Sequence, residues 1–219
     1  MTMSDSPFVG WTAIAGGVVG VVGFVALLLL FIVGEPFGTL NDILSIPVAL
    51  LVVPLLFALY RLHAASYPVV AVVALLAGLF GYASAAIGSG LLVLGRIDFN
   101  TSLLFGIGGF GLIGLWALLT SGMGLRGDTL PGAAAWAGLA LSVAPTLALL
   151  AVLRAESVAN ALSAMGGQTA AGVQVSPLAM AFIVLGGLSY AAMPLWTIWL
   201  GRLFLEGRMG LPAAVALGQ

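Results

Sequence analysis

Six long apolar runs dominate this sequence, and each is long enough to cross a membrane as a helix. A helix rises about 1.5 Å per residue and the hydrocarbon core is about 30 Å thick, so a span needs about 20 mainly apolar residues. The runs are continuously apolar, whereas the strands of a membrane β-barrel alternate. We therefore predict an all-α polytopic membrane protein, a single domain over residues 1–219. It is a six-transmembrane-helix bundle with spans at about 8–33, 39–62, 67–94, 102–121, 131–153 and 177–204.

The composition agrees with this class. Hydrophobic residues make up 62% of the chain and charged residues only 6%, far from the roughly half-apolar, quarter-charged norm of soluble domains. The formal net charge is -1, and nucleic-acid binding requires a basic surface that neutralises phosphates. We expect membrane lipids as partners and no nucleic acid.

Missing residue types exclude several chemistries. The chain has neither cysteine nor lysine and only one histidine, His63. Thiolate nucleophiles, disulfides, cysteine-ligated clusters and lysine Schiff bases are excluded, and one chain cannot supply two histidines to a haem or a metal. We predict no cofactor and no metal, with His63 as an interfacial histidine.

Arginine counts near the span ends predict the orientation. Arg61, Arg126, Arg202 and Arg208 fall on one side, and Arg96 and Arg154 on the other. Cytoplasmic loops carry the excess of basic residues, so both termini are predicted to be cytoplasmic. The N-terminal "MTMSDSPFVGW" lacks the features of a cleaved signal, so we expect the first run to remain as a span. Exclusive use of arginine, with abundant Ala and Gly, favours a bacterial inner membrane.

The middle of every predicted span lacks Asp, Glu, Lys, Arg and His. Ionisable groups deep in a membrane usually mark ion or proton pathways, so the pattern disfavours proton-driven pumps and voltage sensors. Neutral polar groups do gather near mid-depth, and Pro194 leaves the carbonyl of Tyr190 without its helical donor. Together with Met193 they form the candidate ligand-binding set: Tyr82, Ser84, Ser142, Thr146, Ser189, Tyr190 and Met193.

That set has two interpretations. The hydroxyls can bond to their own or neighbouring helices, which stabilises a span modestly. Alternatively, they line a mid-membrane cavity that binds or transports a neutral lipophilic small molecule. Glycine-rich stretches, "GGVVGVVG" and "FGIGGFGLIG", favour close helix packing within the chain. They leave open a second function, a structural or assembly subunit of a homo-oligomer or of a larger complex.

Charged residues at the predicted outer mouth are Glu35, Asp42, Arg96 and Arg154. The run from Thr39 to Asp42 fits a capping box, which would make Asp42 a helix-start residue. Glu35 is then the less explained acid, a candidate ligand contact or partner of Arg96 or Arg154. A membrane enzyme that uses Glu35 and Asp42 is a third alternative. We expect no enzyme, because no convergent acid–base set accompanies the two acids.

Three further patterns predict interfacial features. Acids two residues after an arginine, as in "RID" at Arg96, suggest local neutralisation in solvated turns. Val158, Leu162 and Met165 suggest a short amphipathic interfacial helix. The tryptophans fall near predicted span ends, where such rings anchor at the interface: Trp11, Trp116, Trp136, Trp196 and Trp199.

The stretches "TLPGAAAWAGLA" and "MPLWTIWLGRLF" resemble those of uncharacterised bacterial multi-pass families of the domain-of-unknown-function kind. The resemblance implies a six-helix membrane fold. It implies no activity and transfers no functional residue.

Overall fold

The computed structural model describes residues 6–152 and 177–209, and within these residues it contains helices and no strands. The helices are α1 (Ser6–Val33), α2 (Phe37–Ala64), α3 (Pro68–Val93), α4 (Phe99–Arg126), α5 (Gly132–Val152) and α7 (Pro177–Leu205). Each corresponds to one predicted span, so the all-helical class is confirmed. The predicted interfacial helix at Val158, Leu162 and Met165 lies outside the described residues.

Five of these helices, α1 to α4 and α7, are long and apolar enough to cross a membrane. In α5 the apolar stretch between Gly132 and Leu147 is shorter. Large apolar side chains cover the outer faces of the helices. Phe31, Ile32, Leu50 and Val69 are each more than two-thirds exposed, and apolar surface of this extent is typical of contact with lipid. The chain is a multi-pass helical membrane protein.

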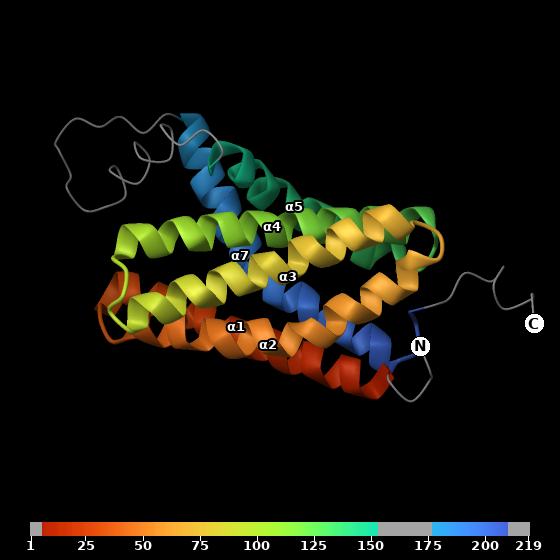
Figure 1. The fold of residues 1–219 in the computed structure, drawn as a ribbon, viewed down its shortest axis with the longest axis horizontal. Helices are drawn as coiled ribbons and strands as arrows, with labels where there is room; N and C mark the ends of the chain where they lie inside the picture. Colours follow the sequence, from red (N-terminus) through yellow and green to blue (C-terminus); the bar gives the residue numbers. More distant parts are fainter. Residues whose placement is uncertain (1–5, 153–176, 210–219) are drawn as a thin grey trace, which may run out of the picture.

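The helices form a closed ring in which each packs against its neighbours in the chain. α1 packs on α2, α2 on α3, α3 on α4 and α4 on α5, and the ring closes through α5 on α7 and α7 on α1. Short connections between α1 and α5 make consecutive helices antiparallel, while α7 crosses the bundle obliquely (Figure 1). This arrangement encloses a space between helices that are distant in sequence.

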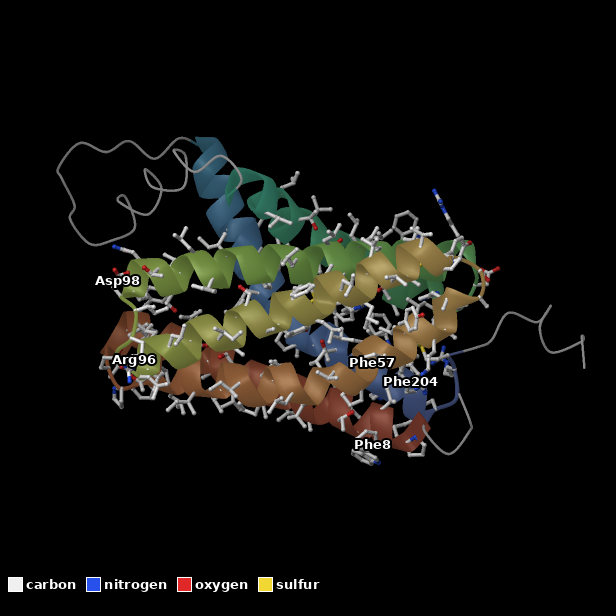
Figure 2. All side chains as sticks on the ribbon, in the orientation of Figure 1. Phe8, Phe57, Arg96, Asp98 and Phe204 are labelled. Carbon is white, nitrogen blue, oxygen red and sulfur yellow. The ribbon has the colours of Figure 1, made fainter. Side chains whose placement is uncertain are left out.

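The bundle has two ends, and they differ in their residues. The termini end carries the start of α1 and the end of α7, where Gly10 lies against Leu205. The Glu35 end carries the α1–α2 and α3–α4 connections. Figure 2 shows Phe8 and Phe204 at the first end and Arg96 and Asp98 at the second. The start of α1 and the end of α7 thus lie on one side of the bundle, as an even number of spans requires. The side of the membrane that they face stays a prediction.

The buried core fills the half of the bundle toward the termini end. Leu55, Leu59, Trp116, Trp196 and Leu200 are each at most 2% exposed. The rings of Trp116 and Trp196 meet edge to face at 5.7 Å, and Trp196 Nε1 donates a hydrogen bond to the Ala134 carbonyl at 2.8 Å.

The prediction that all five tryptophans are interface anchors is therefore wrong for Trp116 and Trp196. Trp11 and Trp136 are about two-thirds exposed (64% and 66%) and fit that role, and Trp199 is 38% exposed. The ring of Trp116 and the ring of Trp196 pack on each other instead, because edge-to-face pairs bury large apolar area between helices.

Glycines allow the tightest contacts between neighbouring helices. A Cβ at Gly81 of α3 would lie 2.8 Å from the carbonyl oxygen of Gly109 of α4, and a Cβ at Gly109 would lie 2.7 Å from that of Gly81. Backbones can approach this closely only where both side chains are hydrogen. These glycines pack within the chain.

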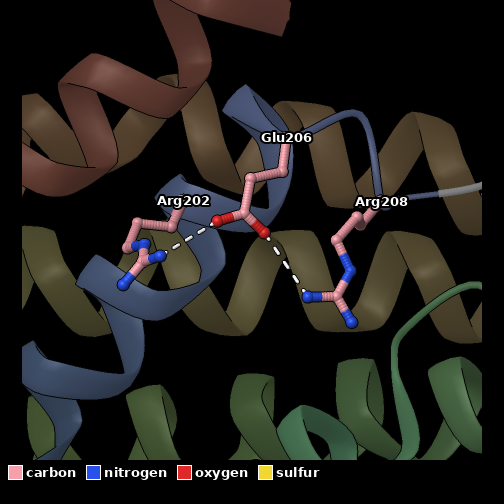
Figure 3. A network of polar contacts seen from close by, with 3 residues as sticks. All are labelled: Arg202, Glu206 and Arg208. Atoms are coloured by element: carbon pink, nitrogen blue, oxygen red, sulfur yellow. Dashed lines mark hydrogen bonds and ion pairs between the residues drawn. The ribbon is translucent and has the colours of Figure 1, made fainter.

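Charged groups at the helix ends act locally. Asp98 is the N-cap of α4: its Oδ1 accepts a hydrogen bond from the Thr101 N–H at 2.7 Å, which holds the pKa of the Asp98 carboxyl below its usual range. At the other end, Glu206 pairs with Arg202 at 3.1 Å and with Arg208 at 3.4 Å (Figure 3). These two are the ion pairs found in residues 6–152 and 177–209. In the "RID" turn Asp98 therefore caps α4 and does not pair with Arg96.

Candidate functional site

A cavity of about 470 Å³ occupies the half of the bundle toward the Glu35 end. Five helices line it, and we call it the bundle cavity. Its wall comes from residues 16–31 of α1, 41–52 of α2, 82–92 of α3, 99–113 of α4 and 190–197 of α7. It reaches the last turns of α1 and α3, while the tryptophan core closes the opposite half.

The wall is mostly apolar. Glycines 16, 17, 20 and 23 of α1 provide a smooth face, and leucine, valine and phenylalanine side chains cover most of the remainder. Cavities of about 300–1,000 Å³ with apolar walls and a few polar groups are typical of small-molecule sites.

Polar groups in the wall gather around one carboxylate. Asp42, Asn41, Ser89 and Tyr190, which we call the Asp42 cluster, come from α2, α3 and α7. The Ser89 hydroxyl donates to Asp42 Oδ1 at 3.0 Å, and the Tyr190 hydroxyl donates to Asn41 Oδ1 at 3.4 Å. The Tyr190 ring also meets Phe110 edge to face at 5.3 Å, so packing and hydrogen bonding both fix its position.

The capping-box prediction for Asp42 is wrong. Helix α2 begins at Phe37, two residues before Thr39, and its start has no side-chain capping bond from Thr39 or Asp42. Glu35 Oε2 instead accepts hydrogen bonds from the N–H (3.2 Å) and the hydroxyl (3.1 Å) of Thr39. Glu35 therefore satisfies an otherwise unpaired N–H of the first turn, and Asp42, one turn further on, faces the cavity.

The ligand-binding residues predicted from the sequence divide into two groups. Tyr82, Tyr190 and Met193 line the bundle cavity. Ser142 and Thr146 donate to carbonyls of their own helix at 2.7 Å each, and Ser84 donates to the Phe105 carbonyl of α4 at 3.0 Å. Ser189 is buried outside the wall. The structure thus brings three of the seven together with the Asp42 cluster.

Sequence reasoning missed Asn41 and Ser89 as wall residues. A signal was present, because Tyr82, Ala85, Ser89 and Leu92 recur at helical spacing and so share one face of α3. The spacing alone does not tell whether that face meets lipid, another helix or a cavity.

The other predicted charged residues lie outside the wall. Arg96 is exposed at the Glu35 end (Figure 2), and Arg154 lies outside the described residues. His63, the next-to-last residue of α2, is only 1% exposed, and its interfacial depth stays a prediction. Its Nδ1 lies 3.4 Å from Thr129 Oγ1, and its Nε2 has no hydrogen-bond partner within the described residues. No group of three or more metal-ligating side chains occurs in the part of the chain that the structure describes.

Fold and cavity define the class as a multi-pass helical membrane protein with an internal, largely apolar chamber. Comparisons with models of protein families, with curated proteins and with solved structures found no match to this chain. Its function is therefore argued from the cavity itself.

Proposed function

We propose that this protein binds a lipophilic small molecule in the bundle cavity, within the membrane. The observation that carries the proposal is the combination of an apolar chamber of about 470 Å³ and a small number of polar groups on its wall, four of which form the Asp42 cluster. Apolar burial supplies affinity, at roughly 25 cal/mol per Å², and a few polar groups fix the ligand's orientation.

Binding is better supported than catalysis or assembly. Glu35, one of the two acids of the enzyme alternative, is occupied by both polar groups of Thr39. The glycines of the close contacts between α3 and α4 are covered within the chain, so they are not available to a homo-oligomer seam. The arginine distribution supports cytoplasmic termini.

The cavity extends to the Glu35 end of the bundle in this conformation. The wall includes Leu30, Leu92 and Phe99, which lie in the terminal turns at that end. Toward the termini end the path is closed by Leu55, Trp116 and Leu200, all at most 1% exposed. Transport would require these packed helices to separate, so a binding role needs fewer assumptions.

Native mass spectrometry of the purified chain tests the proposal. Ala85 lines the cavity between Tyr82 and Ser89, and Ala133 of α5 is exposed and lies outside the cavity wall. We expect the wild-type protein and the Ala133→Phe control to carry an apolar adduct. Ala85→Phe fills the chamber and should lose it. Equal adduct content in all three proteins, or none in the wild type, would contradict the proposed function.

A further inference from the structure

We propose that the bundle cavity selects lipophilic molecules bearing a protonated amine, and that Asp42 receives the ammonium group. This inference rests on the proposed function and names the class of ligand. The hydroxyl-lined cavity expected from the sequence suited a neutral ligand. A carboxylate in the wall changes that expectation, because the group that a ligand must satisfy is then an acceptor.

The hydroxyl hydrogens closest to Asp42 already form hydrogen bonds within the protein. Ser89 donates to Asp42 Oδ1, Tyr190 to Asn41 Oδ1, and Ser45 and Thr197 to backbone carbonyls of their own helices at 2.7 and 3.0 Å. A hydroxyl has one hydrogen to donate. These four hydroxyls therefore have no second hydrogen to donate to a ligand. The remaining side-chain donors of the wall are the amides of Asn41 and Asn100 and the hydroxyls of Tyr82 and Ser102, so within the described residues the acceptor at this end that lacks a donor is the Asp42 carboxylate.

In the described part of the chain, the Asp42 carboxylate lacks one hydrogen-bond donor and a positively charged partner. Its Oδ1 accepts the Ser89 hydrogen bond, whereas Oδ2 accepts none from the residues that the structure describes. In the same residues no arginine pairs with Asp42, since both ion pairs are made by Glu206. Asp42 is half-buried, so its carboxylate is partly removed from water, and among those residues no cation lies beside it. A ligand ammonium would supply the missing charge and the missing donor together.

The charged groups around the cavity also favour a cation. No arginine of the described residues contributes to the cavity wall. Of the other charged residues at this end, Glu35 lies within hydrogen-bonding reach of Thr39, three residues before Asp42, Asp98 caps α4, and Arg96 is exposed outside the wall. The polar end of the cavity is thus negative, while the remainder suits a hydrocarbon body.

Two probes of nearly equal shape test the inference. 1-Adamantylamine and 1-adamantanol share one compact apolar body and differ in an ammonium or a hydroxyl group. Calorimetric titrations of the full chain in a neutral maltoside detergent at pH 7 compare them. We expect the amine to bind at least about tenfold more tightly, because a charge-assisted hydrogen bond in an apolar site outweighs a neutral one.

Matched variants assign the effect. Asp42→Asn keeps the shape and removes the charge, so the amine should lose about tenfold in affinity and the alcohol should stay within about twofold. Asp128→Asn, a carboxylate change at an exposed residue of the α4–α5 connection outside the wall, should leave the preference intact. Equal binding of both probes, or an amine preference that survives Asp42→Asn, would overturn the inference.

A third probe keeps the test independent of any variant's folding. 1-Adamantanecarboxylate carries the opposite charge, and we expect the wild-type chain to bind it at least about tenfold more weakly than the amine. Comparable binding of the two ions would also overturn the inference. The native mass spectrometry described above decides the proposed function separately, so a chamber that binds apolar molecules without an amine preference would refute this inference alone.

Discussion

The Ser89 hydroxyl of α3 donates a hydrogen bond to Oδ1 of Asp42 on α2 across 3.0 Å. This contact joins two helices at the cavity wall. The sequence had predicted that the Asp42 carboxylate caps the start of α2. The position of Asp42 within α2 therefore matters both for the stability of the wall and for what the cavity can bind.

Ser89→Ala should destabilise the bundle by about 1 kcal/mol. The substitution leaves Asp42 Oδ1 without its donor in an apolar surrounding, and interhelical hydrogen bonds in membranes contribute about this much. Unfolding in mixed micelles of increasing dodecyl sulfate content gives the measurement. Ser45→Ala is the matched control, because Ser45 bonds to a carbonyl of its own helix. Equal losses for the two variants would show that the α2–α3 contact contributes nothing specific.

Gly109→Ala should destabilise the protein by about 1–3 kcal/mol. The new methyl group would lie 2.7 Å from the Gly81 carbonyl oxygen and 3.0 Å from the Ala85 nitrogen. Both are backbone atoms, so α3 and α4 must move apart to relieve the overlap. Gly108→Ala on the same helix meets nothing within 4 Å and should be neutral or slightly stabilising. The same unfolding assay compares the stability of the two variants. A Gly109→Ala variant as stable as the wild type would refute the close packing of α3 on α4.

Hydropathy predicted the spans because the thickness of the membrane sets one length that every crossing helix must meet. It did not predict the role of Asp42, since this depends on where α2 begins. A turn has about 3.6 residues, so a start at Phe37 places Asp42 in the second turn of α2. The packing of α2 against α3 then makes its side chain face Ser89 and the cavity, and hydropathy does not report this packing. The burial of Trp116 and Trp196 was equally hidden, because both the lipid-facing and the inward faces of these helices are apolar.

Trp196→Phe should destabilise the core at the termini end by about 1–3 kcal/mol. The change removes the Nε1 hydrogen bond to Ala134 and part of the edge-to-face contact with Trp116, and it leaves unfilled volume among fully buried neighbours. Trp136→Phe alters a ring that is 66% exposed and should change stability by less than about 0.5 kcal/mol. Circular dichroism during thermal unfolding compares the two. A larger loss for Trp136→Phe would contradict the assignment of core and interface.

Asp98 should make the stability of the protein depend on pH, and the structure gives the direction of the change. The Thr101 N–H stabilises the charged carboxylate at the start of α4, so the folded-state pKa of Asp98 lies below its ordinary value of about 3.9. A depressed pKa contributes stability that is fully present above the unfolded-state pKa and is lost as the pH falls through the folded-state value. Wild type should therefore exceed Asp98→Asn in stability at pH 7, and the difference should shrink below about pH 4. Chemical unfolding of both proteins from pH 7 to pH 3 measures it. A difference that stays constant or grows on acidification would refute the capping role of the Asp98 charge.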